Sequence, residues 1–202
     1  MNQDQNQPDS QAIRKNRIKF LFIVFLFILP VGVAGYLKLT GWRPESTINH
    51  GTLVTPARPV PDMKFGPADQ KVLTGKWSLV VVTGSDCDQP CRDNLHALRQ
   101  IHIGQGKNQE RVQRVLVHTD KVTALSALGT EYPKLNILRV EASSFPVLEN
   151  WLAVEGQGNT LSGSRVFMID PLGNFMMYYA DGFDPTKIRR DLARLLRVSH
   201  IG

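Results

Sequence analysis

The sequence predicts an α/β protein in which a central mixed sheet, flanked by helices, is tethered by one N-terminal transmembrane helix. Three observations support this prediction: a long uncharged apolar run near the N-terminus, alternating strand-like and helix-like segments from residue 76, and a hairpin pattern followed by an amphipathic helix at the end. Apolar side chains make up 42% of the 202 residues, which excludes a collagen-like or wholly disordered chain. One sizeable domain with an N-terminal appendage is therefore expected.

The uncharged run from Phe20 to Leu37 is the predicted transmembrane helix. Its 18 residues correspond to about 27 Å of helix. Extended by Leu39 and Thr40, the run is long enough to span a bilayer core of about 30 Å. Basic residues crowd the flank before the run and are sparse after it, so the positive-inside rule places the N-terminus in the cytoplasm. The rest of the chain is then expected on the other side of the membrane.

A cleaved signal peptide is the alternative interpretation of this run, with Gly32 and Ala34 as its small-residue site. Such peptides have an apolar stretch of about 7–15 residues, which is shorter than the run seen here. We therefore favour an uncleaved anchor at residues 18–40. A buried helix of a soluble protein fits less well, because the stretch is apolar on all sides.

The segments around the anchor differ from it in composition. Residues 1–17 begin with polar residues that lack an apolar period, so a disordered cytoplasmic tail is expected. Residues 41–70 contain five prolines, which disfavour both helix interior and sheet ladder, so an extended linker is expected there. Residues 71–202 are then expected to form the folded domain.

A βαβ unit is predicted from residue 76 onward. Residues 76–84 (KWSLVVVTG) are rich in β-branched residues and apolar on both faces, which is typical of a strand buried on both sides of a sheet. Residues 92–103 carry apolar side chains at helical spacing, and residues 111–118 (RVQRVLVH) supply a second strand. Such a unit joins parallel strands through a crossover helix.

The second half of the domain is predicted to end in a hairpin and a helix. After a mixed stretch at residues 121–152, the segments 165–170 and 175–180 form the hairpin. Asp184 is a natural N-cap for the last helix, with Pro185 at its first position. The apolar face of this helix is made by Ile188, Leu192, Leu195 and Leu196. A βαβ unit followed by a hairpin and a terminal helix is the thioredoxin arrangement.

Cys87 and Cys91, the two cysteines of the chain, follow the first strand of this unit and open its helix. If Cys91 lies in the first helical turn, the two Cα atoms are about 6 Å apart, within the range that closes a disulfide. The N–H groups and dipole of a helix N-terminus stabilise a thiolate, which makes such a cysteine nucleophilic or ready for a metal. Asp86 and Asp88 act in the opposite direction, because nearby carboxylates disfavour a second negative charge.

Two interpretations of the cysteine pair are open: a reactive or metal-binding site, and a plain structural disulfide, which is common outside the cytoplasm. A disulfide closing so small a loop constrains the unfolded chain little, so its contribution should lie near the bottom of the usual range of about 0–5 kcal/mol. We therefore favour a redox or metal function.

Residues 48–198 resemble the Sco/SenC family of membrane-anchored thioredoxin-fold proteins. The resemblance rests on the strand LVVVTG, on the two cysteines with three residues between them, and on FMIDPLGNFMMYYADGFDP near the end. Residues 49–60 (NHGTLVTPARPV) are also similar to the segment that leads into the domain in related proteobacterial proteins. The family assists copper insertion into cytochrome c oxidase. The resemblance therefore implies a thioredoxin-like domain in the periplasm, anchored in a bacterial inner membrane, with copper(I) as its metal.

The family's metal site consists of two thiolates and one histidine, and this sequence departs from it. Counting back from Pro171, the position of the histidine is taken by Ser162. The prolines that usually follow the two cysteines are replaced by Asp88 and Arg92. The complete ligand set of the family is therefore not expected here.

Copper(I) still suits a site of two thiolates, Cys87 and Cys91, because it is a soft ion. His118, at the end of the second strand, is the best substitute for a third ligand, and the alternative is that it caps the strand end. His96, five residues after Cys91, is expected to face solvent. The methionines of the hairpin are expected to pack in the core; they are Met168, Met176 and Met177.

The resemblance to the Sco/SenC family implies a membrane-anchored assembly factor for cytochrome c oxidase. Cys87 and Cys91 would act by thiol–disulfide exchange on partner cysteines, by copper(I) transfer, or by both. The missing histidine favours exchange, with Cys87 as the attacking thiol because it lies in the loop. The expected partner is the copper-bearing oxidase subunit or another assembly factor. The alternative is a non-catalytic membrane accessory protein that carries a structural disulfide and docks on the oxidase.

The net charge of the chain does not identify a binding partner. Without residues 1–39 the net charge falls from +6 to +3, which is too mild to indicate nucleic acid, and we see no nucleic-acid-binding motif. The last helix is basic and would suit anionic lipid headgroups or an acidic partner, although a solvated helix face is the commoner explanation. Its basic residues are Lys187, Arg189, Arg190, Arg194 and Arg197.

Overall fold

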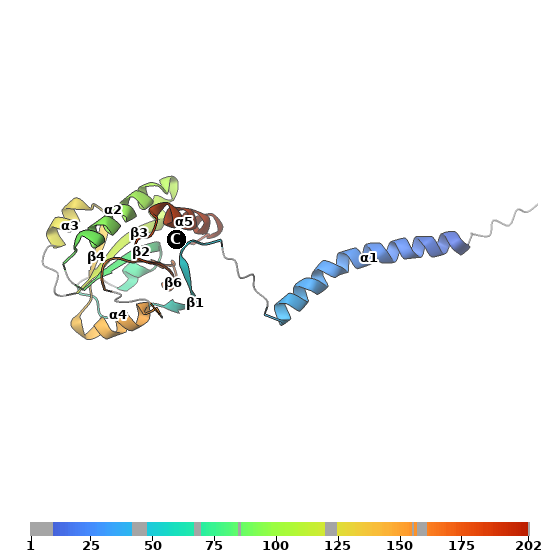
Figure 1. The fold of residues 1–202 in the computed structure, drawn as a ribbon, viewed down its shortest axis with the longest axis horizontal. Helices are drawn as coiled ribbons and strands as arrows, with labels where there is room; N and C mark the ends of the chain where they lie inside the picture. Colours follow the sequence, from blue (N-terminus) through green and yellow to red (C-terminus); the bar gives the residue numbers. More distant parts are fainter. Residues whose placement is uncertain are drawn as a thin grey trace, which may run out of the picture. The chain divides into compact units, whose positions relative to one another are not determined.

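In the computed structural model the chain divides into two compact units, Met1–Ile48 and Asn49–Gly202. The structure describes residues 10–41, 48–66, 70–84, 86–119, 125–154, 156 and 161–201. All the strands of the described chain lie in the second unit, and the first contains a single long helix (Figure 1).

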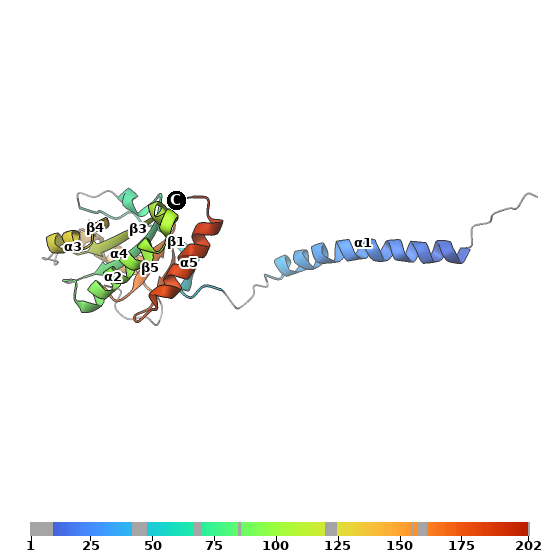
Figure 2. The same ribbon diagram turned by 90° about the horizontal axis from the view of Figure 1, so that it is seen from above.

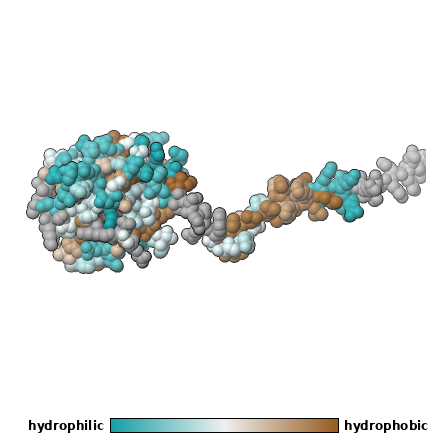
Figure 3. Space-filling model, in the orientation of Figure 1, coloured by the Kyte–Doolittle hydropathy of each residue, from teal (hydrophilic) through white to brown (hydrophobic). Residues whose placement is uncertain are grey.

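The helix of the first unit, α1 (Ser10–Leu39), is long and apolar enough over Arg14–Leu39 to cross a membrane, judged by length and composition. None of that span is buried inside the protein. Figure 3 shows apolar side chains along most of the helix and hydrophilic ones at its N-terminal end. A helix of this length that is apolar on all sides is typical of a membrane span.

The start of α1 differs from the expected disordered tail over residues 1–17. Residues 10–17 are helical, because Arg14, Lys15 and Arg17 are good helix formers through which a helix begun in the apolar run extends at little cost. Residues 1–9 of the expected tail lie outside the described residues.

The second unit is built on one six-stranded sheet in the order β1-β6-β5-β2-β3-β4. β2 is parallel to β3, which is parallel to β4, whereas β5 is antiparallel to β2, β6 to β5 and β1 to β6. The strands are β1 (Thr52–Pro59), β2 (Trp77–Thr83), β3 (Val112–His118), β4 (Leu135–Arg139), β5 (Val166–Ile169) and β6 (Asn174–Tyr179). The predicted mixed sheet is thereby confirmed, with the βαβ unit and the hairpin in the predicted places.

Helices cover both faces of this sheet (Figures 1 and 2). The helices α2 (Gln89–Ile103), α3 (Leu125–Glu131) and α5 (Pro185–Val198) lie on one face, and α4 (Phe145–Leu152) lies on the other. Short 3₁₀ turns occur at Gln70–Leu73, Gly106–Arg111 and Ala142–Ser144. The predicted cap of α5 is confirmed, since the Asp184 carboxylate accepts a hydrogen bond of 2.8 Å from Thr186 N.

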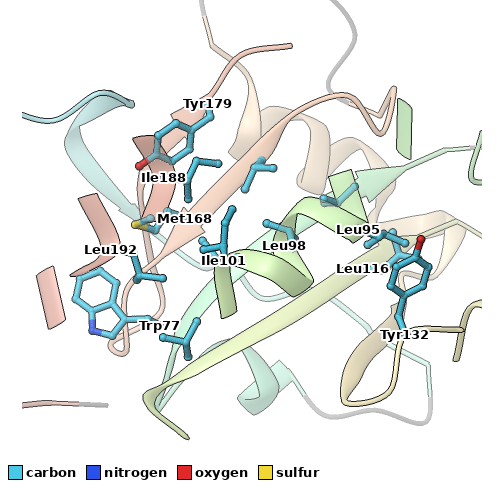
Figure 4. Close-up of a cluster of buried hydrophobic side chains, with 14 of the residues drawn as sticks. Trp77, Leu95, Leu98, Ile101, Leu116, Tyr132, Met168, Tyr179, Ile188 and Leu192 are labelled. Atoms are coloured by element: carbon cyan, nitrogen blue, oxygen red, sulfur yellow. The ribbon is translucent and has the colours of Figure 1, made fainter. Parts of the chain in front are cut away.

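Two hydrophobic clusters hold the layers together, because alternate residues of β2 point to opposite faces of the sheet. Leu79 and Val81 pack under α2 and α5, and Val80 and Val82 pack under α4. Figure 4 shows the first cluster, in which Leu98 and Ile101 of α2 meet side chains of β5 and α5. Trp77 and Trp151 are buried, one in each cluster. A strand buried on both sides was predicted for residues 76–84, and the structure confirms it.

β1 lies inside the range 41–70, where an extended linker was expected. Thr52–Pro59 pairs with β6 and belongs to the second compact unit. A strand tolerates Pro56 and Pro59 here because β1 is at the edge of the sheet, where a missing N–H interrupts no interior ladder. Residues 42–47 and 67–69 of the expected linker lie outside the described residues.

A buried carboxylate fastens the start of the second unit to α5. Asp191 accepts hydrogen bonds from His50 N at 2.7 Å, Gly51 N at 3.1 Å and Tyr179 Oη at 3.0 Å, and its other oxygen lies 2.9 Å from His50 Nδ1. Burial opposes ionisation of Asp191, but these hydrogen bonds outweigh it and hold the pKa of the carboxyl below its usual value. The segment that leads into β1 is therefore bound to the middle of α5.

Candidate functional site

Cys87 and Cys91 are joined by a disulfide bond, with the sulfurs 1.95 Å and the Cα atoms 5.2 Å apart. Cys87 lies in the short segment after β2, and Cys91 lies in the first turn of α2. The bond therefore joins the segment before α2 to the first turn of the helix, with a Cα separation in the range that was predicted to allow a disulfide. It lies at the end of β2, at the edge of the sheet where the parallel strands finish.

The residues between the cysteines start the helix. The Asp88 carboxylate accepts a hydrogen bond from Cys91 N at 3.3 Å and so caps α2, while Pro90 occupies the first turn, where its missing N–H costs nothing. This local sequence is why the chain turns into a helix directly after Cys87. It also leaves Cys91 at a helix N-terminus, where backbone N–H groups favour a negative sulfur.

Arg92 supplies a positive charge to the same loop. Its Nε donates a hydrogen bond of 3.2 Å to the carbonyl oxygen of Cys87. The guanidinium is therefore held beside Cys87 and counteracts Asp86 and Asp88, which are both exposed. A cation at this position favours the thiolate of a reduced Cys87.

A second segment, Leu161–Gly163, covers the buried side of the disulfide. It runs beside the end of β2, with Gly84 N donating to Leu161 O and Gly163 N donating to Val82 O, both at 2.9 Å. Gly163 has φ +74°, and a Cβ atom there would lie 2.8 Å from Cys91 Cβ. Glycine is required here both by the left-handed backbone and by the close approach to Cys91.

Asn94 links this covering segment to α2. Its Nδ2 donates a hydrogen bond of 2.8 Å to Gly163 O. Asn94 and Gly163 were not singled out in the sequence. The resemblance identified Ser162, the neighbour of Gly163, as the position of the family's histidine. No local sequence pattern predicts the hydrogen bond between Asn94 and Gly163.

The two cysteine residues differ slightly in exposure. Cys87 is 7% exposed and Cys91 is 0% exposed, because the Leu161–Gly163 segment lies against Cys91. The Cys87 side of the bond is therefore the more accessible one. The role of Cys87 as the attacking cysteine stays a prediction.

A pocket of about 360 Å³ lies next to the disulfide loop. It opens between α2 and the segment that leads into α5, and it reaches Pro90, which stands between the cysteines. Its remaining lining residues are Asp93, Asn94, Ala97, Asp181, Gly182, Phe183 and Pro185. A partner segment bound at this pocket would lie beside the cysteines.

The third metal ligand expected from the resemblance is not assembled in the described residues. Ser162 bridges to Thr83, beside the cysteine loop as the count from Pro171 implied. His118 is buried at the end of β3, and its Nδ1 lies 2.7 Å from Thr119 O. Among the residues that the structure describes, no group of three or more His, Cys, Asp or Glu side chains is arranged to hold a metal ion.

The remaining candidates lie away from the sulfurs or inside the core. His96 is exposed on α2, as expected. Met168 and Met177 are buried in the cluster beneath α2 and α5, and Met176 packs against that cluster. The hairpin methionines are therefore packing residues, as the sequence predicted.

A family model described as "transmembrane-like, thioredoxin-like, C-terminal domain" matches residues 77–199. The chain belongs to this family. The match begins with β2 and ends just after α5, so this thioredoxin-like domain includes the disulfide and its covering segment, whereas β1 lies outside the match. No curated protein matches the chain.

Solved structures show the same fold at low sequence identity. Arabidopsis thaliana ScoI with copper bound is 19% identical, with a TM-score of 0.51 over 64% of this chain and 89% of that one. Yeast Sco1 is 16% identical, with a TM-score of 0.54 over 64% and 84%. A thiol:disulfide interchange protein of the thioredoxin family from Chlorobium tepidum TLS is 14% identical, with a TM-score of 0.53 over 71% and 99%. The predicted resemblance of the thioredoxin-like domain to Sco proteins is confirmed in its fold.

Proposed function

We propose that this protein is a membrane-anchored assembly factor for cytochrome c oxidase that exchanges electrons with the cysteines of a partner through Cys87 and Cys91. The observation that carries the proposal is the disulfide at the N-terminus of α2, in which Cys87 keeps 7% of its surface exposed and Cys91 is fully buried against Gly163. The proposed partner is the copper-bearing subunit of the oxidase or another assembly factor.

The exchange begins from the reduced dithiol. The Cys87 thiolate attacks one sulfur of a partner disulfide, which forms a mixed disulfide and releases the partner's other sulfur as a thiolate. The Cys91 thiolate then attacks Cys87 Sγ, which releases the partner's second thiolate and forms the Cys87–Cys91 bond. The structure corresponds to this oxidised product, and a dithiol donor must reduce it before the next cycle.

The surroundings of the two cysteines suit these roles. Arg92 lies beside Cys87, where it favours the attacking thiolate. Cys91 lies at the helix N-terminus, where the backbone N–H groups favour the thiolate that resolves the mixed disulfide. The Cα separation of 5.2 Å allows the second attack without unwinding the helix.

Copper(I) transfer is the second mode of action within this proposal. Two thiolates, Cys87 and Cys91, would hold the ion as cargo, with His118 as the third ligand. The Nδ1 of His118 faces a backbone carbonyl, so Nε2 is the atom left for coordination. Because Ser162 stands where the family has histidine, the donor set fits copper less well than it fits thiol exchange, and we favour exchange.

Trapping the mixed disulfide tests the proposal. With Cys91→Ser, the Cys87 thiol attacks a partner disulfide but nothing resolves the product, so a covalent adduct should accumulate on non-reducing gels. The matched variant Cys87→Ser should give no adduct. The opposite pattern would reverse the two roles. If neither variant forms an adduct and the double variant fully supports oxidase assembly, the protein is the non-catalytic accessory protein with a structural disulfide.

Copper binding is tested separately by titrating the reduced full chain with copper(I) against a competing chelator, without oxygen. Copper transfer predicts one tightly held ion that is lost when both cysteines are replaced by serine and weakened by His118→Ala. Failure to compete with the chelator would exclude copper transfer and leave thiol exchange.

The proposed location is a bacterial inner membrane, with α1 as the single span. The basic residues before the span support an N-terminus in the cytoplasm and a thioredoxin-like domain in the periplasm. An oxidising periplasm agrees with the closed disulfide.

A further inference from the structure

The exposed face of α5 carries a basic stripe, which we define as Lys187, Arg190, Arg194 and Arg197. All four side chains are exposed. Their spacing of three, four and three residues places them along one side of the helix. The opposite side of α5 packs into the core through Ile188, Leu192 and Leu196, so the stripe faces away from the domain.

Few acidic residues belong to α5 and its N-cap. The single acidic residue within α5 is Asp191, which is buried and accepts hydrogen bonds from His50, Gly51 and Tyr179. Asp184, at the N-cap, attracts Lys187 and Arg190 but already accepts a hydrogen bond from Thr186 N. The exposed surface of the helix therefore has an excess of positive charge.

The same helix receives the chain that arrives from the membrane span. The span ends at Leu39, and His50 is bound to Asp191 in the middle of α5. The ten residues from 40 to 49 reach at most about 36 Å when fully extended. A short tether of this kind keeps the stripe at high effective concentration near the lipid surface, so even weak headgroup contacts are populated.

We propose that the basic stripe of α5 binds the headgroups of anionic phospholipids. Arginine guanidinium groups pair with phosphate oxygens through two parallel hydrogen bonds, and three of the four residues are arginines. Each basic residue next to an anionic bilayer strengthens association roughly fivefold. The proposal depends on the membrane anchor but not on thiol exchange.

Labelling of Lys187 with an amine-reactive reagent tests the proposal. The full chain is inserted into vesicles of phosphatidylcholine alone or with added phosphatidylglycerol, and the labelling rate of Lys187 is compared with that of exposed Lys64 by mass spectrometry. Phosphatidylglycerol is expected to slow Lys187 labelling severalfold relative to Lys64. High salt should reverse the effect, because the contacts are exposed and electrostatic.

Two triple variants that lose the same charge distinguish an effect of the stripe from an effect of net charge on lipid binding. Replacing Arg190, Arg194 and Arg197 by glutamine should lower the ratio of bound to unbound domain by about two orders of magnitude and abolish the protection of Lys187. Replacing the exposed Lys76, Lys107 and Lys134 by glutamine should leave that protection intact. Circular dichroism checks that both variants remain folded.

Equal relative labelling in the two kinds of vesicle would overturn the proposal, and so would protection that survives the loss of the three arginines. Either result would mean that the stripe contacts an acidic protein or only solvent. If the chain fails to float with phosphatidylcholine vesicles, the anchor is wrong and this inference fails with it. Trapping of a mixed disulfide is independent of each of these results.

Discussion

Arg92 and Gly163 each contact one cysteine of the disulfide. Arg92 donates to the carbonyl of Cys87 at 3.2 Å and so places a positive charge beside this cysteine. Gly163 approaches Cys91 so closely that a Cβ atom would lie 2.8 Å from the Cβ of the cysteine. In the proposed exchange, one residue thus supplies positive charge beside the attacking cysteine, and the other packs against the resolving cysteine.

Arg92→Gln should slow the alkylation of reduced Cys87 at neutral pH. Removing the guanidinium raises the pKa of the Cys87 thiol, and one pKa unit lowers the thiolate fraction up to roughly tenfold. The measurement is the rate of reaction with iodoacetamide as a function of pH, in a Cys91→Ser background. Arg99→Gln, which removes an exposed arginine two turns further along α2, is the control and should leave the pH profile in place. An unchanged profile for Arg92→Gln would contradict the role given to Arg92.

Gly163→Ala should destabilise the oxidised domain more than Gly182→Ala. Both glycines have positive φ, +74° and +72°, so both substitutions cost roughly 1–2 kcal/mol of backbone strain. Only at position 163 does the added Cβ meet another residue, because Gly182 has open space around it. Chemical denaturation measures the free energy of unfolding of both variants. Equal losses of this free energy would show that the covering segment moves to accommodate the added Cβ atom without loss of stability.

The connection between α5 and the segment before β1 depends on a single carboxylate. Asp191 accepts hydrogen bonds from two backbone N–H groups and from Tyr179, and burial raises the pKa of that tyrosine, an effect that the Asp191 charge reinforces. Replacing the carboxylate removes acceptors from several donors at once. The buried donors that lose their acceptor then destabilise the folded state.

Asp191→Asn should lower the free energy of unfolding at neutral pH by about 1–3 kcal/mol. The pKa of Asp191 is lowered in the folded protein, so its stabilisation is complete above the pKa of an unfolded aspartate, about 3.9, and is lost as the pH falls through the lower folded value. The wild type should therefore lose more stability on acidification than Asp191→Asn. Urea unfolding at neutral and acidic pH measures the difference, and exposed Asp62→Asn serves as the control. Parallel loss of stability in the wild type and Asp191→Asn would contradict the prediction.

Sequence patterns predicted the elements whose signal is local. β2 is apolar on both faces, and α5 has its cap, its proline and its apolar face within a few residues. β1 and β4 lie at the edges of the sheet and are mostly exposed or half-buried, so neither has a clear apolar pattern, and α3 is too short for one.

The cysteine pair was predicted from its motif and its place before a helix. The contacts of Gly163 with Cys91 and of Asp191 with His50 join residues far apart in the sequence, so local spacing could not reveal them.

At the scale of the whole domain, stability rests on the two hydrophobic clusters rather than on the disulfide. The clusters contain the large side chains of every strand from β2 to β6 and of all the helices that cover the sheet. A bond between residues four apart in the sequence constrains little of the unfolded chain. The reduced domain should therefore keep its fold, as a redox cycle requires.

Reduction of Cys87–Cys91 is expected to lower the free energy of unfolding by about 2 kcal/mol or less and to leave the transition cooperative. Urea unfolding with and without a phosphine reductant measures the effect. A reduced domain that unfolds at neutral pH without denaturant would show instead that the bond is a structural requirement.

The position of β1 at the edge of the sheet has a consequence for any fragment of this protein. A fragment starting at Trp77, where the family match starts, would lack β1 and expose the backbone N–H and C=O groups of β6 that β1 now occupies. Unpaired strands of this kind template the addition of strands from other molecules, so such a fragment should form soluble oligomers or precipitate. A fragment starting at Asn49 keeps β1 and the bonds to Asp191, and it should stay dispersed at the same concentration.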